Sequence, residues 1–301
     1  MVTPKSTVKY SIIIIVKNDR GIDETIQDLK AHVPMETTEI VVIDASGDAL
    51  KDIQEKYPEV QWNHFVSKTG KKISIPEQRN AGMAAAHGQI IIFVDANCTV
   101  EKDWFTELMK PLETENEKIV SGAIWSKQED NIHNTQNTRN QDMLYLNEAP
   151  TMNLAMYREV YDSVGAFNET FDYGSDVDFV TRARDKGYKI RNTPKAILYH
   201  DWGDFSDEIK RAFRYGQARI NIYEKHNAKI GDLIKSDFIT LIYPIFILFL
   251  PISIIWPWYW LFLLIPLIKN RNNKPFQTTA LNLVFGWGIL TKLYEKGRTK
   301  R

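Results

Sequence analysis

The first 230 residues alternate between short apolar runs and segments in which apolar residues recur every three or four positions. The runs are rich in β-branched residues, as expected of strands buried on both faces of a parallel sheet. The spaced segments are typical of helices that pack one face against such a sheet. Strands are predicted at 10–16, 39–43, 60–65 and 89–94, and helices at 22–33, 78–86, 104–112 and 205–226. This alternation predicts βαβ units and an α/β fold.

The C-terminal part follows a different pattern. From Phe238 to Ile268 the chain runs for 31 residues without a charge, whereas one membrane-spanning helix needs about 20 apolar residues. Four prolines interrupt this stretch, and the aromatic cluster at 256–260 has side chains that favour the headgroup region of a bilayer. Because basic residues flank both ends, both ends are expected on the cytoplasmic side. The pattern predicts a kinked helical hairpin that enters and leaves one leaflet.

A buried helical hairpin of a soluble protein is the alternative, but 31 uncharged residues exceed the usual length of a buried helix. Residues 279–294 are apolar with interruptions and lead into a basic tail, which favours a helix lying on anionic lipid. We therefore expect a globular domain at 1–230 and a membrane-associated helical part at 231–301, on the cytoplasmic side of the cell membrane.

Composition excludes several classes of protein. The 38 basic residues balance 38 acidic ones, so there is no basic excess with which to bind nucleic acid. Cys98 is the single cysteine, which excludes an intramolecular disulfide framework and a thiolate zinc cluster. The N-terminal residues lack the apolar stretch of a secretory signal, and we expect the bulk of the chain in the cytosol.

Acidic residues follow three of the predicted strands, at Asp19, Asp44 and Asp95. Each one is also a usual turn or cap residue. In open α/β sheets, however, ligands bind outside the carboxyl ends of the strands, and together the three predict a site for a polar, phosphorylated ligand. Neither the G-x-x-x-x-G-K-[ST] loop nor a G-x-G-x-x-G loop follows a strand, which disfavours a P-loop NTPase and an NAD-dependent dehydrogenase.

Seven sequence blocks occur in a characteristic order between about residues 10 and 225. They are Ser-Ile-Ile-Ile-Ile-Val-Lys-Asn-Asp at 11–19, Glu-Ile-Val-Val-Ile-Asp-Ala-Ser-Gly-Asp at 39–48, Gln-Arg-Asn-Ala-Gly at 78–82, Phe-Val-Asp-Ala-Asn at 93–97, Asn-Leu-Ala-Met-Tyr-Arg at 153–158, Gly-Ala-Phe-Asn-Glu at 165–169 and Gly-Ser-Asp-Val-Asp-Phe at 174–179. In these blocks the chain resembles the family-2 inverting glycosyltransferases of GT-A fold. The resemblance implies a Rossmann-like, mixed but mostly parallel sheet flanked by helices, here followed by the apolar helical membrane segment.

The resemblance also implies roles in binding a nucleotide-sugar donor. Asp44 matches the residue that holds the nucleobase, and Asp19 matches an acidic position near the nucleotide. Arg79 matches a nucleotide contact, and a guanidinium suits a diphosphate because it binds phosphate in a bidentate way. The family's Asp-x-Asp motif, which would hold Mg²⁺ or Mn²⁺ on the diphosphate, stands here as Asp95 and Asn97. His200 matches a metal-side histidine of many relatives, although a packed histidine is an equal alternative.

The resemblance also implies that Asp176 is the general base, because relatives carry Glu-Asp where this chain has Ser175 and Asp176. Asp178 would face away from Asp176 on a helix, which favours a structural role. A helix N-terminus decorated with acids is the plainer interpretation of the block. The synthase motif Gln-x-x-Arg-Trp is not matched at 217–220, which argues against a processive polymerase.

A basic face on the helix at 205–226, formed by Arg211, Arg214 and Arg219, could meet a lipid-linked diphosphate, the membrane or only solvent. We expect an inverting enzyme that transfers one sugar to an acceptor at the cytoplasmic membrane face, such as a lipid-linked intermediate of cell-surface polysaccharide or glycolipid synthesis. Because Asn97 and Ser175 are neutral, the alternative is a catalytically silent, membrane-bound protein that binds a nucleotide sugar. A nucleotidyltransferase is weaker still, because its glycine-rich phosphate loop is absent.

Overall fold

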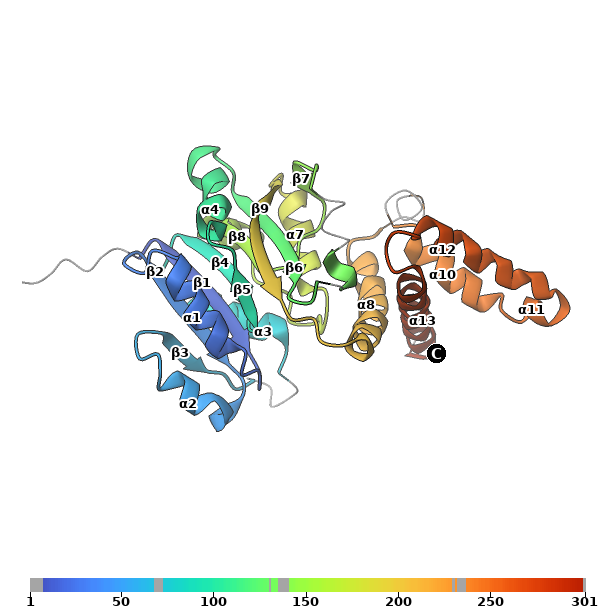
Figure 1. Cartoon of the computed structure of the whole chain (residues 1–301), viewed down its shortest axis with the longest axis horizontal. Coiled ribbons are helices and arrows are strands. Elements are labelled where there is room, and N and C mark those ends of the chain that lie inside the picture. The colour runs from blue at the N-terminus through green and yellow to red at the C-terminus, as the bar shows by residue number, and fades with distance from the viewer. Residues whose placement is uncertain are drawn as a thin grey trace, which may run out of the picture. The chain divides into compact units, whose positions relative to one another are not determined.

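The computed structural model describes residues 8–67, 73–129, 131–134, 141–228, 231 and 237–299. Its contacts divide the chain into two compact units, Met1–Asp201 and Trp202–Arg301 (Figure 1). The boundary expected after residue 230 falls inside the second unit, beside residues outside the described ranges. The reason is helix α8 (Phe205–Lys225), which packs on the C-terminal helix α13 (Pro275–Thr299) and is therefore grouped with it.

The first unit is built on one nine-stranded sheet in the order β3-β2-β1-β4-β8-β6-β9-β5, with β7 beside β9. Its first four strands confirm the sequence prediction to within one or two residues. They are β1 (Tyr10–Val16), β2 (Thr38–Asp44), β3 (Gln61–His64) and β4 (Ile90–Asp95), and all four run parallel.

The other half of the sheet, which the apolar pattern does not predict, contains β5 (Cys98–Val100), β6 (Ile119–Ser126), β7 (Tyr145–Leu146), β8 (Asn153–Tyr157) and β9 (Ile190–His200). Strand β8 is antiparallel to both β4 and β6, and β6 is parallel to β9. Strands β1–β4, β6 and β9 therefore share one direction, which confirms the mixed, mostly parallel sheet.

Helices cover the sheet and form the core with it. They are α1 (Ile22–His32), α2 (Lys51–Gln54) after the 3₁₀ turn η1 (Gly47–Leu50), α3 (Ile75–Ala85), α4 (Trp104–Thr114), α6 (Arg158–Val164) and α7 (Ser175–Asp185). Ile13, Phe93 and Phe179 lie in this core. Helix α3 begins three residues before its predicted start, because Ser74 and Glu77 cap each other's backbone N–H groups.

A buried asparagine joins three elements of the sheet. Asn153 Nδ2 donates to the carbonyl oxygens of Ala123, at 2.8 Å, and Ala196, at 2.9 Å, while Asn153 Oδ1 accepts from Trp104 Nε1 at 2.9 Å. The bonds to Ala123 and Ala196 lie where the β6–β9 register shifts between Gly122 and Ala123. A Cβ on Gly122 would stand 2.3 Å from Asn153 Nδ2, so the amide needs glycine there. The amide thus satisfies backbone groups that the irregular register leaves unpaired.

Replacing Asn153 by Leu is expected to lower the free energy of unfolding by about 2–4 kcal/mol, because two buried carbonyls and an indole N–H lose their partner. Urea unfolding followed by tryptophan fluorescence measures this. Asn147, which is exposed, supplies the control Asn147→Leu, with a change within about 0.5 kcal/mol. Equal stability of the two variants would contradict a structural role for the amide.

At the amino ends of the strands, Glu39 holds the start of β1 to the turn before β4. Its Oε1 accepts from Ser11 Oγ and from the backbone N–H of His87, each at 2.5 Å, and its Oε2 lies 3.1 Å from the His87 ring. Burial by itself would raise the pKa of Glu39, but these hydrogen bonds to the carboxylate leave the pKa below its ordinary value.

A lowered folded-state pKa means that the Glu39 carboxylate stabilises the fold above its unfolded pKa of about 4.3, and that this contribution is lost as the pH falls through the folded value. We expect Glu39→Gln to cost about 1.5–3 kcal/mol at pH 7, the usual range for hydrogen bonds to a charged group. The difference from wild type should shrink below about pH 4. Urea midpoints at pH 7 and pH 3.5 measure it, and a difference that does not depend on pH would contradict the assignment.

The second unit contains the uncharged stretch as four short helices. They are α10 (Ile239–Leu248), α11 (Ile252–Ile255), η2 (Pro257–Leu263) and α12 (Leu264–Lys269). Prolines explain the segmentation, because Pro251 and Pro257 each stand where one helix has ended and the next begins. Phe246 of α10 stacks on Tyr259 of η2 at 4.9 Å between ring centroids, which closes the hairpin. Among the described residues, no helix has the length and apolarity needed to cross a membrane.

Helix α13 packs closely against both α8 and α10 because it has a glycine at each contact. A Cβ on Gly288 would stand 2.2 Å from the Phe213 carbonyl oxygen of α8, and one on Gly286 would stand 2.8 Å from Tyr243 Cβ of α10. Through these contacts α13 packs on protein along two faces. At 275–299 it is also longer than the 279–294 segment expected from the sequence. On α8, Arg211 pairs with Glu208 at 2.7 Å, so part of the predicted basic face is engaged within this unit.

Candidate active site

The topology of the first unit brings the predicted site residues to one edge of the sheet. Strands β1, β2, β4, β6 and β9 run in one direction, so their carboxyl ends meet at this edge. Helix α3 leads back to β4 and helix α7 leads back to β9, which places the amino ends of both helices at the same edge. The predicted residues gathered there are Asp19, Asp44, Arg79, Asp95, Asn97, Asp176 and His200.

Asp44, the last residue of β2, is buried and held on both oxygens. Its Oδ1 accepts from the Ser46 N–H at 2.8 Å, and its Oδ2 accepts from Trp62 Nε1 at 3.0 Å. Ser46 Oγ in turn accepts from the Asn18 N–H at 2.7 Å, where Asn18 adopts a positive φ of 56°. The loops after β1 and β2 are thereby locked together. Only 1% of the Asp44 surface is exposed, so within the described structure this carboxylate serves to fix the loops at this edge.

Asp19 shapes the loop after β1. Its Oδ1 accepts from the Gly21 N–H at 2.9 Å, and Gly21 packs so tightly on Asn97 that a Cβ there would stand 2.6 Å from Asn97 Cβ. Asn97 itself has φ 63°, a left-handed conformation that asparagine tolerates. The loops after β1 and β4 are thus in direct contact.

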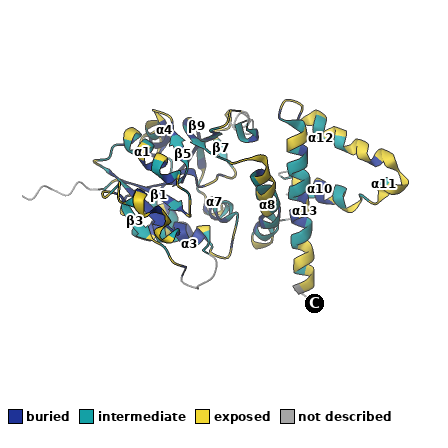
Figure 2. Cartoon of the chain, turned by 60° about the horizontal axis from the view of Figure 1, so that its bottom comes forward, coloured by how far each residue is buried: buried dark blue, intermediate teal, exposed yellow. Residues whose placement is uncertain are grey.

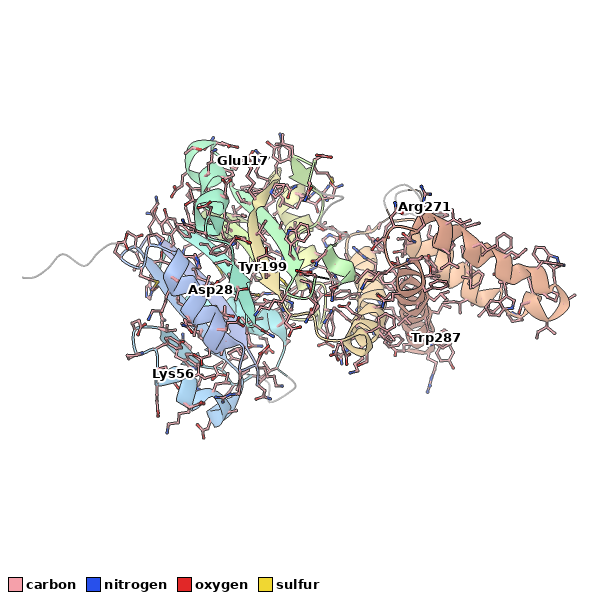
Figure 3. All side chains as sticks on the ribbon, viewed as in Figure 1. Asp28, Lys56, Glu117, Tyr199, Arg271 and Trp287 are labelled. Carbon is pink, nitrogen blue, oxygen red and sulfur yellow. The ribbon has the colours of Figure 1, made fainter. Side chains whose placement is uncertain are left out.

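Strand β5 holds the Asn97 loop in place. Thr25 Oγ1 and Asp28 Oδ2 of α1 accept from the N–H groups of Cys98, at 2.8 Å, and Val100, at 2.6 Å. On the other side β5 pairs with β9, where the Tyr199 hydroxyl donates to Glu101 at 2.7 Å. Asp28 and Tyr199 are labelled in Figure 3. These contacts make the loop between β4 and β5 a rigid part of the edge.

The buried Cys98 thiol interacts electrostatically with three charged residues. Burial raises the pKa of the Cys98 thiol, the negative charges of Asp95 and Asp19 raise it further, and the positive charge of Lys127 lowers it. Lys127, which follows β6, was missed by the sequence analysis because a lone lysine after an unpredicted strand carries no signal. Its Nζ donates to Asn97 Oδ1 at 3.2 Å and pairs with Glu24 at 2.6 Å.

The expected metal ligands do not form a complete set. The Asn97 carbonyl oxygen, expected to assist Asp95, instead accepts a hydrogen bond from the Lys127 ammonium. His200 ends β9 and pairs in register with Cys98, so it does lie next to this loop. In the part of the chain that the structure describes, no three His, Cys, Asp or Glu side chains are grouped to hold a metal ion. An ammonium at a ligand oxygen also opposes a divalent cation, so these residues do not fit the expected ion.

Arg79 is buried in α3 with 6% of its surface exposed. Its Nη1 donates to Ser175 Oγ at 3.1 Å, and the guanidinium lies 5.7 Å from the centre of the Phe167 ring. Its Nε has no hydrogen-bond partner, and among the described residues no acid pairs with it. Since a buried guanidinium stays charged, this arrangement favours an anionic ligand at Arg79.

Asp176 stands in the first turn of α7, directly after the Ser175 that Arg79 contacts. It is partly exposed, and its Oδ1 accepts from the Val177 N–H at 2.9 Å. Asp178 is fully buried and pairs with Arg182 Nε at 3.0 Å, which agrees with a structural role. Arg182 also donates to the carbonyls of 164–166 and so anchors the loop before α7. Of the two acids, Asp176 is the one open to a substrate.

A family model for glycosyl transferase family 2 matches residues 11–176, more than half of the chain. The chain belongs to this family. The matched segment holds every predicted site residue except His200, and it ends on Asp176. The chain is accordingly a glycosyltransferase that uses a nucleotide-sugar donor.

The similarity to known proteins extends over 72% to 98% of this chain. Glycosyltransferase AglE of Haloferax volcanii is 24% identical over 231 residues, which is 72% of this chain and 75% of AglE. The mannosyltransferase PcManGT from Pyrobaculum calidifontis, solved with GDP-Man and Mn²⁺, has a TM-score of 0.72 at 17% identity, over 98% of this chain and 90% of that one. GalNAc-T7, solved with UDP, GalNAc and Mn²⁺, has a TM-score of 0.53 at 15% identity, over 77% and 58% of the chains. These structures share the GT-A-like fold of this family-2 enzyme.

Proposed function

We propose that this family-2 enzyme is an inverting glycosyltransferase that adds one sugar to a lipid-linked acceptor at the cytoplasmic face of a membrane. The acceptor class would be an intermediate of cell-surface polysaccharide or glycolipid synthesis. The observation that carries the catalytic half is the juxtaposition at the sheet edge of an open carboxylate, Asp176, with the buried cation Arg79, which are joined through Ser175.

The proposed reaction needs one base and one anion site. Asp176 takes the proton of the acceptor hydroxyl as that oxygen attacks the anomeric carbon of the sugar, and the proton ends on its carboxyl group. The bond from that carbon to the diphosphate breaks on the opposite side, which inverts the configuration. Arg79 stabilises the negative charge that develops on the leaving diphosphate, and Asp44 holds the nucleobase. No step of this reaction is routed through a divalent ion.

Asp176→Asn is expected to lower kcat by about 10²–10⁴-fold, the usual contribution of a general base, while donor affinity stays nearly constant. The measurement is release of nucleoside diphosphate from GDP-mannose and UDP-GalNAc in the presence of polyprenyl-phosphate-linked sugars, together with a donor-binding isotherm.

The control is Asp172→Asn, an exposed acid shortly before α7, which should leave kcat unchanged. An unaltered kcat in Asp176→Asn would remove this residue from the mechanism. Donor binding without turnover in the wild type, on every acceptor tried, would favour the silent nucleotide-sugar-binding protein instead.

The membrane half of the proposal rests on exposed apolar side chains in the second unit. Ile254, Ile255 and Trp258 are 83%, 89% and 66% exposed, and α11 and α12 are mostly exposed in Figure 2. Soluble proteins rarely leave a contiguous apolar surface of this kind in water. The 31 residues around them carry no charge, whereas Lys269 and Arg271 follow directly. This arrangement suits a hairpin that lies in one leaflet with its basic flank on anionic headgroups.

Replacing Ile254, Ile255 and Trp258 together by Asp is expected to abolish binding to anionic liposomes, since each buried side chain of this size contributes about 1.5–3 kcal/mol. Flotation in 1 M NaCl measures it. The wild type should stay bound, because apolar insertion is not screened by salt.

Val66, an exposed apolar residue of the first unit, provides the control Val66→Asp, which should still float with the liposomes. Elution of the wild type by salt would contradict insertion. Self-association of the wild type without liposome binding would show that the apolar surface meets a second copy of the chain.

A further inference from the structure

We infer that Lys127 and Arg79 together neutralise the donor diphosphate, so that this enzyme binds nucleoside diphosphates without a divalent metal ion. The inference deepens the proposed function and rests on its donor site. It starts from a feature shared by two neutral residues at this edge, Asn97 and Ser175: each accepts a hydrogen bond from a cation.

Lys127 is the first of these cations. It follows the end of β6, and its Nζ lies 3.2 Å from Asn97 Oδ1 at the carboxyl edge of the sheet. An acid at 97 would pair with this ammonium and cancel its charge. The neutral amide positions the ammonium without cancelling its charge. Lys127 also pairs with Glu24, but the Glu24 side chain is 58% exposed, and a pair open to solvent holds a charge only weakly.

Arg79 is the second cation and is held in the same manner. Its Nη1 donates to the neutral Ser175 Oγ at 3.1 Å, its Nε is unpartnered, and only 6% of its surface is exposed. Burying a guanidinium without an acid is costly, and arginine cannot lose its proton to escape that cost. No acid among the described residues offsets the Arg79 charge, so an anion bound at this edge gains electrostatic attraction from it.

The charge balance at the edge supports two cations acting on one diphosphate. Asp19 follows β1 and Asp95 ends β4, at the same edge of the sheet where Lys127 follows β6, and the two acids would repel an approaching diphosphate in the absence of positive charge. Asn97 removes one such acid and leaves its oxygen bonded to Lys127 instead of open to an ion. The neutral Asn97 thus provides no carboxylate for a metal ion, and it leaves the positive charge of Lys127 in place at this edge.

The test is titration of the full chain with UDP and GDP, in EDTA and in Mn²⁺, by isothermal calorimetry. We expect wild type to bind one of the two nucleotides in EDTA with a Kd within about tenfold of that in Mn²⁺. Lys127→Met should weaken binding in EDTA by at least tenfold, because it removes the charge and keeps the length of the side chain. Lys110→Met, an exposed lysine on α4, is the matched control and should bind as wild type does.

Asn97→Asp gives the converse readout. The new carboxylate should pair with Lys127, weaken binding in EDTA by about tenfold and make binding depend on Mn²⁺. Circular dichroism confirms folding of each variant.

The inference is overturned if the wild-type Kd in EDTA is more than a hundredfold higher than in Mn²⁺. It is also overturned if Lys127→Met binds nucleotide in EDTA as tightly as wild type does. Failure of both nucleotides to bind folded wild type, with or without Mn²⁺, overturns the donor site of the proposed function instead.

Discussion

Strand β1 is hydrogen-bonded on both sides to parallel strands, with Val16 opposite Asp44 of β2 and Ile15 opposite Asp95 of β4. This register places the two acids on either side of the end of one apolar strand. The loop that follows β1 must then pass between them, where Asn18 bonds to Ser46 and Gly21 packs on Asn97. The positions of Asp19, Asp44, Asp95 and Asn97 depend on this pairing, because all four residues end or follow these three strands.

The insertion of β8 completes the edge. By pairing antiparallel with both β4 and β6, it returns β6 and β9 to the direction of β1, so that Lys127 and His200 reach the same edge as Asp95. Asn153, on β8, satisfies the irregular register that this arrangement produces. The buried Asn153 amide thus also holds in place β6 and β9, the strands that lead to Lys127 and His200.

The two units differ in how they treat apolar side chains. The first buries its apolar strands and concentrates charge at one edge, where cations bond to the neutral acceptors Asn97 and Ser175. The second packs α8, α13 and α10 through glycines such as Gly288, yet leaves the large side chains of α11 and α12 in contact with solvent. Packing energy holds the helices together in one part of this unit, and the other part presents the surface that the proposed lipid contact requires.

The sequence by itself determined the parallel half of the sheet, the family and the residues at the strand ends, because buried parallel strands are continuous apolar runs and their ends are marked by acids such as Asp44 and Asp95. It did not reveal β5–β9, whose short or irregular strands depend on neighbours far away in the chain. Nor could it show that Lys127 reaches Asn97, since those residues are 30 positions apart and meet only after β8 has set the order of the strands. The spacing of Asp95 and Asn97 likewise predicts metal ligands but could not show that the Asn97 oxygen accepts a hydrogen bond from Lys127, because only the tertiary structure brings that ammonium to the loop.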